Sequence, residues 1–461
     1  MSTALVDCDS VAVSDSAVAE LEAAVSGQVI GPMHAEYESA RHIWNASIEK
    51  FPGLIVRCRG LADVVAAVRF ARDHRVLVSI RGGGHNVGGR ALCDGGLVID
   101  LSLMKGIHVD PRTRRVRAQP GVLLGELDRE THVHGLAVPL GVVSRTGIAG
   151  LTLGGGVGWL CRKYGLTCDN VISFELVTAD GEILHVSADD HPDLFWALRG
   201  GGGNFGVVTS FEYQLQPVSM VLGGLVVHPR ERAAELLKFY RGFTQSAPDE
   251  LATYAALLHT PDGAAVAALA VCYCGDLEEG ARVLEPLRAF GPPLVDAIQP
   301  MPMPMAQTMF DAAVPDGNQN YWKSAFLREL SDEAIETIVS HANSATSPLT
   351  AILIEQYGGA AGRVPPGDTA FAQRHAQYDL GILTQWTRPD EWQRHIGWTR
   401  AFAEAMTPYQ SGAYLLNFLG EESSDTIQAA FGSNYARLVE VKTKYDPTNF
   451  FRVNQNIVPR G

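Results

Sequence analysis

The chain has 461 residues, of which 46% are hydrophobic and 19% charged, and its formal net charge is −14 at pH 7. This length exceeds that of one ordinary core, so it predicts a globular protein of two domains. Binding to nucleic acid needs clustered Lys and Arg, and a membrane span needs roughly 18 apolar residues in a row, so the sequence argues against both kinds of partner.

The N-terminal segment carries Asp7, Asp9 and Asp15 and has no Lys or Arg before residue 17. It therefore lacks the positive segment of a secretory signal, and we expect a cytoplasmic protein. Residues 1–26 are expected to be weakly structured, with alanine and acidic residues that favour the start of a helix. The seven cysteines are an odd number at irregular spacings, which predicts buried thiols rather than a disulfide framework.

The first half of the chain alternates helices and strands around glycine-rich loops. Apolar residues at helical spacing predict a helix from Leu61 that ends near His74 and Arg75. An apolar run at 76–80 predicts the next strand, and Asp180-Gly181 marks a hairpin turn. Further expected elements are strands at 97–101, 115–118, 174–178, 182–186 and 207–215 and helices at 123–132 and 193–198.

After Pro217 the glycine motifs stop and a second unit begins. Its pattern alternates helical stretches with apolar strands, which predicts an independent layer of sheet and helix. We expect strands at 222–227, 266–273, 350–357 and 412–418 and helices at 231–243, 332–344 and 389–406.

The sequence Arg81-Gly82-Gly83-Gly84-His85-Asn86 follows the strand at 76–80 directly. Glycines leave peptide N–H groups bare, and such groups form a concavity for an anion, to which Arg81 adds a positive charge. The loop therefore predicts a site for a diphosphate-bearing cofactor. For His85 the residues leave two alternatives open, a hydrogen bond to loop carbonyls or a nucleophile toward an activated cofactor methyl group.

Other motifs exclude competing sites. The segment 201–206 fits G-x-G-x-x-G, but a strand rather than a helix is expected after it, so the dinucleotide fold that uses this fingerprint is disfavoured. The pairs His132/His134 and Cys272/Cys274 lack further ligands at the spacing of a metal site, so no metal is expected. A G-x-S-x-G nucleophile motif is absent.

The glycine loop and several later segments together resemble the vanillyl-alcohol oxidase superfamily, in its berberine-bridge-enzyme-like branch of the 6-hydroxy-D-nicotine oxidase type. The later segments are Thr146-Gly147, 153–159 (LGGGVGW), 162–166 (RKYGL), 169–171 (DNV), 198–206 (LRGGGGNFG) and 454–456 (NQN). The resemblance covers most of the chain. It implies an α+β fold with an FAD-binding domain at 1–216, completed by 420–461, and a substrate domain with an antiparallel sheet at 217–419.

The resemblance also implies FAD as cofactor, bound covalently through His85. In relatives with a second bond, a cysteine attaches to the flavin ring, and its place here falls at about Val143, so we expect attachment through His85 only. The residues assigned to the cofactor are Arg81, Gly82, Gly83, Gly84, His85, Asn86, Gly89, Thr146, Gly147, Gly150, Gly154, Gly155, Gly156, Gly158, Tyr164, Gly165, Asp169, Asn170, Gly203, Asn204, Gly206, Val208, Asn454 and Asn456.

Candidates for catalysis come from apolar stretches of the second domain, because a polar group buried there is costly without a purpose. They are Tyr321, Lys323, Glu355, Tyr414 and Asn417. The alternative is that Lys323 and Glu355 face solvent or pair with each other. The plant members' Ala-Tyr-x-Asn-Tyr motif reads 413–418 (AYLLNF) here, and their glutamate after Tyr-Gly-Gly has no clear counterpart, which argues against their cyclisation chemistry.

The expected activity is that of an oxidase that takes hydride from a C–OH or C–NH carbon of a small secondary metabolite, sugar or alkaloid. Dioxygen is the expected acceptor and hydrogen peroxide the by-product. Two alternatives stay open, a dehydrogenase that uses another acceptor and a flavin-binding protein without turnover. Substrate identity and oligomeric state stay open as well.

Overall fold

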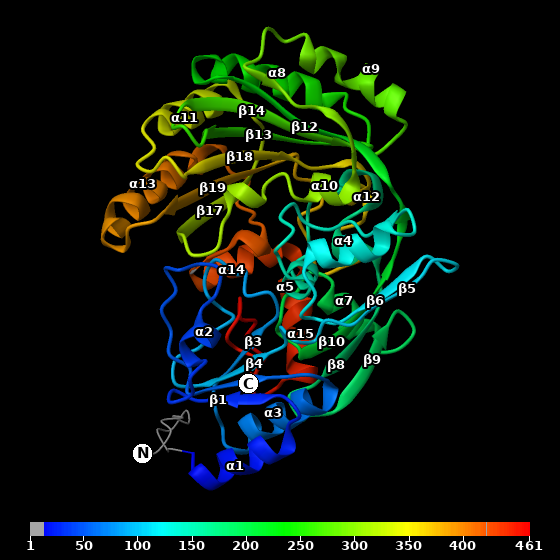
Figure 1. Ribbon diagram of the computed structural model, residues 1–461, viewed down its shortest axis with the longest axis vertical. Coiled ribbons are helices and arrows are strands. Elements are labelled where there is room, and N and C mark those ends of the chain that lie inside the picture. Colours follow the sequence, from blue (N-terminus) through cyan, green and yellow to red (C-terminus); the bar gives the residue numbers. More distant parts are fainter. Residues whose placement is uncertain (1–12, 421) are drawn as a thin grey trace.

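The computed structural model describes residues 13–420 and 422–461. Two halves stack along the long axis of the molecule, with the N-terminal elements at one end and a large helix-covered sheet at the other (Figure 1). Helix α1 (Asp15–Ala24) confirms the helix expected near the N-terminus, while the part of that prediction on residues 1–12 lies outside the described residues, as does Cys8. Among the described residues, no helix is long and apolar enough to cross a membrane.

The N-terminal half begins with a four-stranded sheet in the order β1-β2-β4-β3. Its strands are β1 (Gln28–Ile30), β2 (Leu54–Arg57), β3 (Val78–Arg81) and β4 (Leu97–Asp100), of which the last three run parallel. Helix α3 (Leu61–Asp73) buries Val64, Ala67, Val68 and Ala71 against this sheet, which is the apolar stripe expected from the sequence. The glycine loop therefore leaves the sheet at the carboxyl end of β3.

A second, five-stranded antiparallel sheet follows in the order β5-β6-β10-β8-β9. Its strands are β5 (Ile107–Asp110), β6 (Arg115–Ala118), β8 (Val171–Val177), β9 (Ile183–Ser187) and β10 (Val207–Gln214). The short elements around it are α2 (Tyr37–Arg41), α4 (Leu124–His132), β7 (Leu136–Ala137), α5 (Ile148–Leu153), α6 (Cys161–Tyr164), α7 (Pro192–Leu198) and β11 (Gln216–Pro217).

The C-terminal segment returns to this half. Helices α14 (Ser424–Phe431) and α15 (Tyr435–Tyr445) place Leu438 and Val441 in the same core as the strands β6 and β10. The buried Lys442 ammonium donates to Asp446 at 2.6 Å and to the carbonyls of Asn204 at 2.7 Å and Phe451 at 2.9 Å. The bond to Asn204 joins the end of the chain to the glycine-rich segment that precedes β10, while the other two hold the C-terminal segment together.

The distal half is built on an eight-stranded antiparallel sheet, with the main order β15-β12-β14-β13-β18-β19-β17 and β16 beside β12. Its strands are β12 (Met220–Pro229), β13 (Leu251–His259), β14 (Ala265–Tyr273), β15 (Val295–Asp296), β16 (Gln299–Pro302), β17 (Gln319–Leu327), β18 (Ala351–Gln356) and β19 (Tyr378–Trp386).

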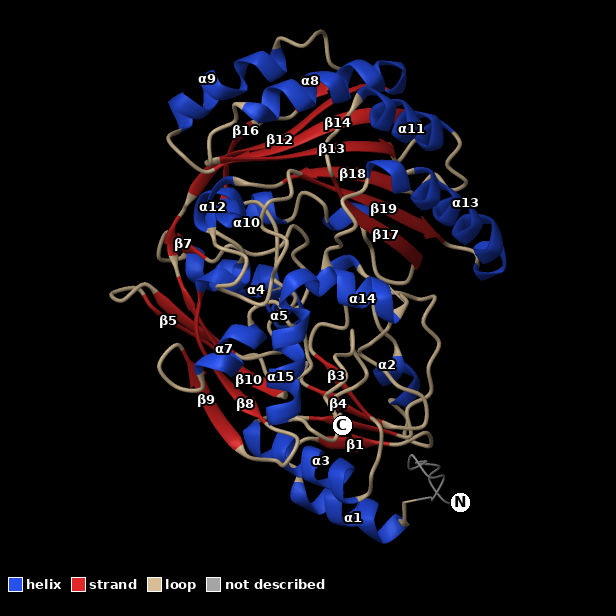
Figure 2. Ribbon diagram, turned by 180° about the vertical axis from the view of Figure 1, so that it is seen from behind, coloured by secondary structure: helices blue, strands red, loops and turns tan. Residues whose placement is uncertain are grey.

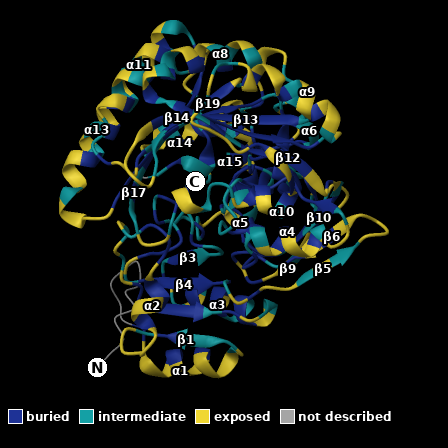
Figure 3. Ribbon diagram, turned by 45° about the horizontal axis from the view of Figure 1, so that its top comes forward, coloured by how far each residue is buried: buried dark blue, intermediate teal, exposed yellow. Residues whose placement is uncertain are grey.

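Four helices cover the outer face of this sheet, and their own outer sides are exposed (Figures 2 and 3). They are α8 (Ala233–Gln245), α9 (Leu277–Arg288), α11 (Asp332–Asn343) and α13 (Trp392–Ala405). The short helices α10 (Met303–Gln307) and α12 (Gly359–Arg363) lie on the other side, which faces the N-terminal half. The two halves have separate hydrophobic cores. For this reason we propose the domain boundaries expected from the sequence, with one domain at 1–216 and 420–461 and the other at 217–419.

The observed elements confirm the α+β class, and most of the predicted helices and strands recur within a few residues of the expected limits. The strand predicted at 412–418 is wrong, since this segment is a loop that ends in a 3-10 helix, Leu416–Phe418. Leu415 and Phe418 pack in one cluster and Leu416 in another, which is not the alternation between two faces that a strand would show. Strand β13 was not predicted, because its alanine-rich sequence has weak strand propensity and its neighbours β14 and β18 bury it.

Candidate active site

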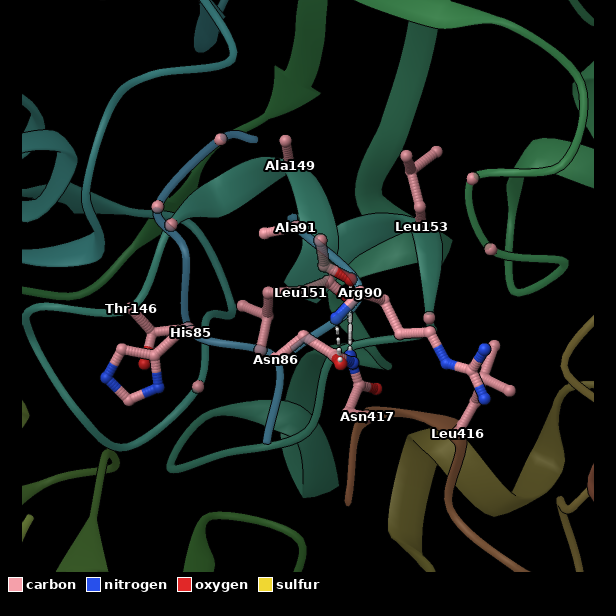
Figure 4. A pocket seen from close by; sticks show the side chains of 18 of the residues that line it. His85, Asn86, Arg90, Ala91, Thr146, Ala149, Leu151, Leu153, Leu416 and Asn417 are labelled. Atoms are coloured by element: carbon pink, nitrogen blue, oxygen red, sulfur yellow. Dashed lines mark hydrogen bonds between the residues drawn. The ribbon is translucent and has the colours of Figure 1, made fainter. Parts of the chain in front are cut away.

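A cavity lies between the N-terminal half and the inner face of the distal sheet. It is lined on one side by the glycine loop 82–86, the segment 141–154 and the tail at 451–455, and on the other by β13, β17, β18 and β19. The loop at 416–418 closes it laterally. Figure 4 shows His85, Asn86, Thr146 and Asn417, which come from three separate segments, around this space.

Two glycine-containing loops meet at the floor of the cavity. A Cβ atom on Gly83 would lie 2.5 Å from the backbone nitrogen of Gly147, and one on Gly147 would lie 2.5 Å from that of Gly83, so neither position has room for a side chain. Gly84 has φ +67°, a conformation that other residues rarely adopt. The loops therefore present peptide backbone to the cavity, as binding of a phosphate-bearing cofactor requires.

His85 is held as a neutral imidazole. Its ring stacks on the indole of Trp44, with centroids 4.4 Å apart and an interplanar angle of 15°. Burial, and then the charge of Arg145, lower the pKa of His85 to about 4. The buried Nε2 atom has no hydrogen-bond partner among the described residues. A neutral imidazole with a free nitrogen is nucleophilic, so His85 fits the role of a covalent attachment point.

The stacking partner of His85 is tied to the distal half. Trp44 is 4% exposed, and its indole N–H donates to the carbonyl of Val314 at 3.1 Å. The next residue, Asn45, donates to the carbonyls of Val87 at 2.7 Å and Asn320 at 3.1 Å and accepts from the Asn320 N–H at 2.9 Å. The segment around Trp44 thus connects the glycine loop to the edge strand β17.

Two buried carboxyl groups face the cavity from the distal sheet. Glu355 on β18 and Asp379 on β19 are direct cross-strand partners, and Tyr254 on β13 lies opposite Glu355. The Tyr254 hydroxyl donates to Glu355, and the Ser324 hydroxyl donates to Asp379 at 3.0 Å. Burial raises the pKa of Glu355 to about 8, with a contribution from the charge of Asp379, and raises the pKa of Asp379 to about 7.

The structure brings about half of the residues assigned to the cofactor to the cavity wall. Those that line it are Gly82, Gly83, Gly84, His85, Asn86, Thr146, Gly147, Gly150, Gly154, Gly203, Gly206, Val208 and Asn454. They come from the ends of strands and from the loops between them, which corresponds to the glycine segments singled out in the sequence.

The other assigned residues are not among those that line this cavity, and their contact with the cofactor stays a prediction. They are Arg81, Gly89, Gly155, Gly156, Gly158, Tyr164, Gly165, Asp169, Asn170, Asn204 and Asn456. Most pack or brace the loops. The Arg81 guanidinium donates to the carbonyl of Ala40 at 2.5 Å instead of facing the cavity, and Asp169 accepts from the fully buried Arg374 at 2.7 Å.

Of the proposed catalytic residues, Glu355 and Asn417 line the cavity, whereas Tyr321, Lys323 and Tyr414 do not. Side chains alternate along a strand, so Trp322 of β17 faces inward and its two neighbours face outward. The Tyr321 hydroxyl accepts from Arg400 at 3.1 Å, and Lys323 forms an ion pair with Glu422 rather than with Glu355.

Sequence reasoning missed Asp379, Tyr254, Trp322 and Trp44. Asp379 could have been found, because it is the one acidic residue in the nine-residue buried run of β19, where an unpaired carboxyl group is costly. The other three carry no local signal.

Val143 lines the cavity, and none of the six described cysteines does. All six are buried free thiols. Within the described part of the chain, no thiol therefore lies at the cavity wall to form a second bond to a flavin.

Comparison with known proteins gives the family. The FAD binding domain matches residues 52–187, and the berberine and berberine-like domain matches residues 413–458. The chain is 36% identical over 442 residues to an FAD-linked oxidoreductase of Dictyostelium discoideum, and the aligned part covers 94% of this chain and 95% of the relative. It is 33% identical over 455 residues to (R)-6-hydroxynicotine oxidase of Paenarthrobacter nicotinovorans, with 95% and 98% covered.

Solved structures agree with this relationship. The crystal structure of 6-hydroxy-D-nicotine oxidase from Arthrobacter nicotinovorans superposes with a TM-score of 0.88 at 31% identity, covering 95% of this chain and 98% of that one. A chitooligosaccharide oxidase, at 23% identity and a TM-score of 0.85, shares the fold. The fold is thus the two-domain architecture of the vanillyl-alcohol oxidase type, and the chain belongs to the berberine-bridge-enzyme-like family of FAD-dependent oxidoreductases.

Proposed function

We propose that this protein is an oxidase with FAD attached through His85 alone, which oxidises a C–OH or C–NH carbon of a small organic substrate and passes the electrons to dioxygen. The observation that carries the proposal is the shared cavity, which joins the glycine loop and His85 to the carboxyl groups of Glu355 and Asp379. Cofactor attachment and proton acceptance thus have separate, facing walls.

The residues at the floor fit FAD. The peptide groups of 82–84 and 146–147 would hold its diphosphate, and Asn454, whose Oδ1 atom is buried without a partner among the described residues, offers an acceptor to the bound cofactor. When bound, the flavin supplies hydride acceptance from carbon and two-electron transfer to dioxygen.

Attachment through His85 uses its neutral imidazole. The His85 imidazole would supply a ring nitrogen as the nucleophile toward the methyl carbon of the isoalloxazine. The new bond would replace one N–H and one C–H bond, and dioxygen would take up the two protons and two electrons as hydrogen peroxide. The stacked Trp44 holds the plane of the ring, and the low pKa keeps its nitrogen unprotonated at neutral pH.

Glu355 and Asp379 would take the proton that leaves the substrate oxygen or nitrogen. Their raised pKa values lie near neutral pH, where a carboxyl pair both accepts and releases a proton readily. Because the two groups are cross-strand partners, we treat them as one unit that shares protons. Asn417, which donates to the carbonyl of Leu151 at 3.2 Å, fixes the loop at the side of the cavity.

Relatives support an oxidase without deciding the substrate. The similar proteins include one named (R)-6-hydroxynicotine oxidase and, at 28% identity, one named tetrahydroberberine oxidase and one named monolignol oxidoreductase. Use of dioxygen is part of the proposal, and a cytoplasmic location stays a prediction.

The test combines attachment with reoxidation. Acid precipitation of the purified protein should leave yellow flavin in the pellet, and peptide mapping should place it on His85. His85→Ala should release its flavin to the supernatant. After anaerobic reduction by dithionite, mixing with air should restore the oxidised spectrum within seconds and form one peroxide per flavin. Slow reoxidation with rapid transfer to an artificial acceptor would instead indicate a dehydrogenase.

A further inference from the structure

The end of the cavity that faces the distal sheet combines two ionisable carboxyl groups with apolar and aromatic surface. Glu355 is 5% and Asp379 is 1% exposed, and neither forms an ion pair with an Arg, Lys or His of the described chain. The second oxygen of Asp379 has no hydrogen-bond partner among the described residues. The two groups are therefore buried carboxyls without a protein cation, and their ionised forms are costly unless a ligand cation compensates the charge.

The shape of this wall is set by strand register. Two residues beyond Asp379 along β19, Gly381 pairs with Ser324 on one side and with Leu353 on the other, so the sheet surface is hollow there. Two residues further, Leu383 pairs with Trp322. At about 3.3 Å per residue, the carboxyl row and Trp322 are about 13 Å apart along the sheet.

The hollow at Gly381 lies between an acidic end and an aromatic end. Phe418 contacts Trp322 edge-on, with centroids 5.9 Å apart, and also lines the cavity. A ligand lying along the hollow would therefore meet carboxyl groups at one end and aromatic rings at the other.

The groups that contact the two carboxyls are neutral. The Arg162 guanidinium lines a small adjoining pocket with Glu355, but it donates to the carbonyls of Leu251 and Tyr357 instead. Tyr254 contacts Glu355 from β13, Ser324 contacts Asp379 from β17, and the hydroxyl of Tyr357 is buried nearby without a partner in the described chain. Cys161 of α6 is a protonated thiol, since burial raises its pKa. A sugar, which needs many polar partners, would meet few here, whereas a cation would meet both carboxyls and the faces of aromatic rings.

We propose that the substrate is a small amine that enters as a cation, with its protonated nitrogen between Glu355 and Asp379 and its apolar body over Gly381 toward Trp322. This narrows the proposed function, on which it rests, from C–OH or C–NH to C–NH. The pair serves both as the recognition element for the ammonium group and as the acceptor of its proton.

The reaction balances on this assignment. The ammonium nitrogen would give one proton to the carboxyl pair, and the adjacent carbon would lose a hydride, for which a bound flavin would supply the acceptor. The substrate becomes an iminium ion, which water hydrolyses to a carbonyl compound and an amine. One proton and one hydride supply the two electrons and two protons that dioxygen takes up as hydrogen peroxide.

The test uses two probes of nearly equal shape. Tetrahydroisoquinoline is a bicyclic amine that is cationic at pH 7.5, and isochroman has an ether oxygen in place of its nitrogen. Anaerobic isothermal titration calorimetry on the protein with its flavin already reduced by dithionite, which cannot accept a further hydride, should give a Kd for the amine at least tenfold lower than for the ether. N-methylbenzylamine serves as a second, more flexible amine. Equal Kd values for tetrahydroisoquinoline and isochroman, or failure of both amines to bind, would overturn the proposal.

Variants assign the effect to the carboxyls. Glu355→Gln and Asp379→Asn should each raise the Kd of the amine between about tenfold and a hundredfold, as expected for loss of a charged hydrogen bond, and should change the Kd of isochroman less than threefold. Asp128→Asn is the matched control, because Asp128 is also a buried carboxyl with a raised pKa but does not line the cavity. An unchanged amine Kd in both cavity variants would contradict the assignment. If the variants lose their flavin, the comparison of the Kd values of tetrahydroisoquinoline and isochroman on the natural protein decides whether the proposal holds.

The same preparation separates the two proposals. If benzyl alcohol or cellobiose reduces the flavin and releases peroxide while both amines fail, the oxidase stands and the amine assignment is wrong. If dithionite-reduced flavin does not reoxidise in air, the oxidase is wrong, and the titration still decides whether an amine is the ligand.

Discussion

Trp44 offers a direct test of how His85 is prepared for flavin attachment. The indole is 4% exposed and stacks on the imidazole at a centroid distance of 4.4 Å. Replacing Trp44 by leucine removes the aromatic face, while replacing it by phenylalanine keeps a ring. Stacked aromatic pairs contribute about 0.5–1.5 kcal/mol beyond their buried area. If stacking orients the imidazole for attachment, its loss in Trp44→Leu should slow attachment about two- to twelvefold.

The assay starts from protein prepared without flavin. FAD is added in excess, samples are precipitated with acid at intervals, and intact mass gives the fraction with bound flavin. We expect Trp44→Phe to attach FAD within about twofold of the natural rate and Trp44→Leu to be slower than either. Because the larger cavity in Trp44→Leu also lowers stability, its folding is checked by circular dichroism at the assay temperature. A folded Trp44→Leu that attaches FAD at the natural rate would refute the positioning role.

Three further predictions concern charge. The pKa values of Glu355 and Asp379 are raised in the folded protein, which therefore keeps protons that the unfolded chain releases above about pH 4. The contribution of these protons to the free energy of unfolding is fully present below about pH 4 and is lost as the pH rises through 7 to 8. The denaturation midpoint should therefore fall less between pH 5 and pH 8 in Glu355→Gln than in the natural protein, and an equal fall would contradict the burial of that charge. Lys442→Met leaves Asp446 buried without its cation and should lower the free energy of unfolding by about 3–5 kcal/mol, measured by urea titration, whereas a loss below 1 kcal/mol would mean that the pair is solvated. Lys323→Met should reduce flavin within about twofold of the natural rate in stopped-flow experiments, because Lys323 faces away from the cavity; a loss above tenfold would show that it acts there.

The sequence by itself determined the cofactor loop and the family. The cofactor loop needs exposed backbone next to a nucleophilic side chain. A strand followed by three glycines and a histidine provides both within a few consecutive residues, so the loop can be recognised from the sequence. The helices of the distal half were also predictable, since an apolar stripe such as Leu236, Leu237 and Tyr240 of α8 is a local period.

Only the tertiary structure decided which polar side chains meet at the cavity. Glu355, Asp379 and Tyr254 lie on three strands that are far apart in the sequence, and their meeting depends on strand order and register. Side chains alternate along a strand, so in the observed register Trp322 points inward and Lys323 outward. A shift of one residue in the register would reverse both. The pairing of strands is set by contacts across the whole sheet, so the chemistry of this wall could not be read from any one segment.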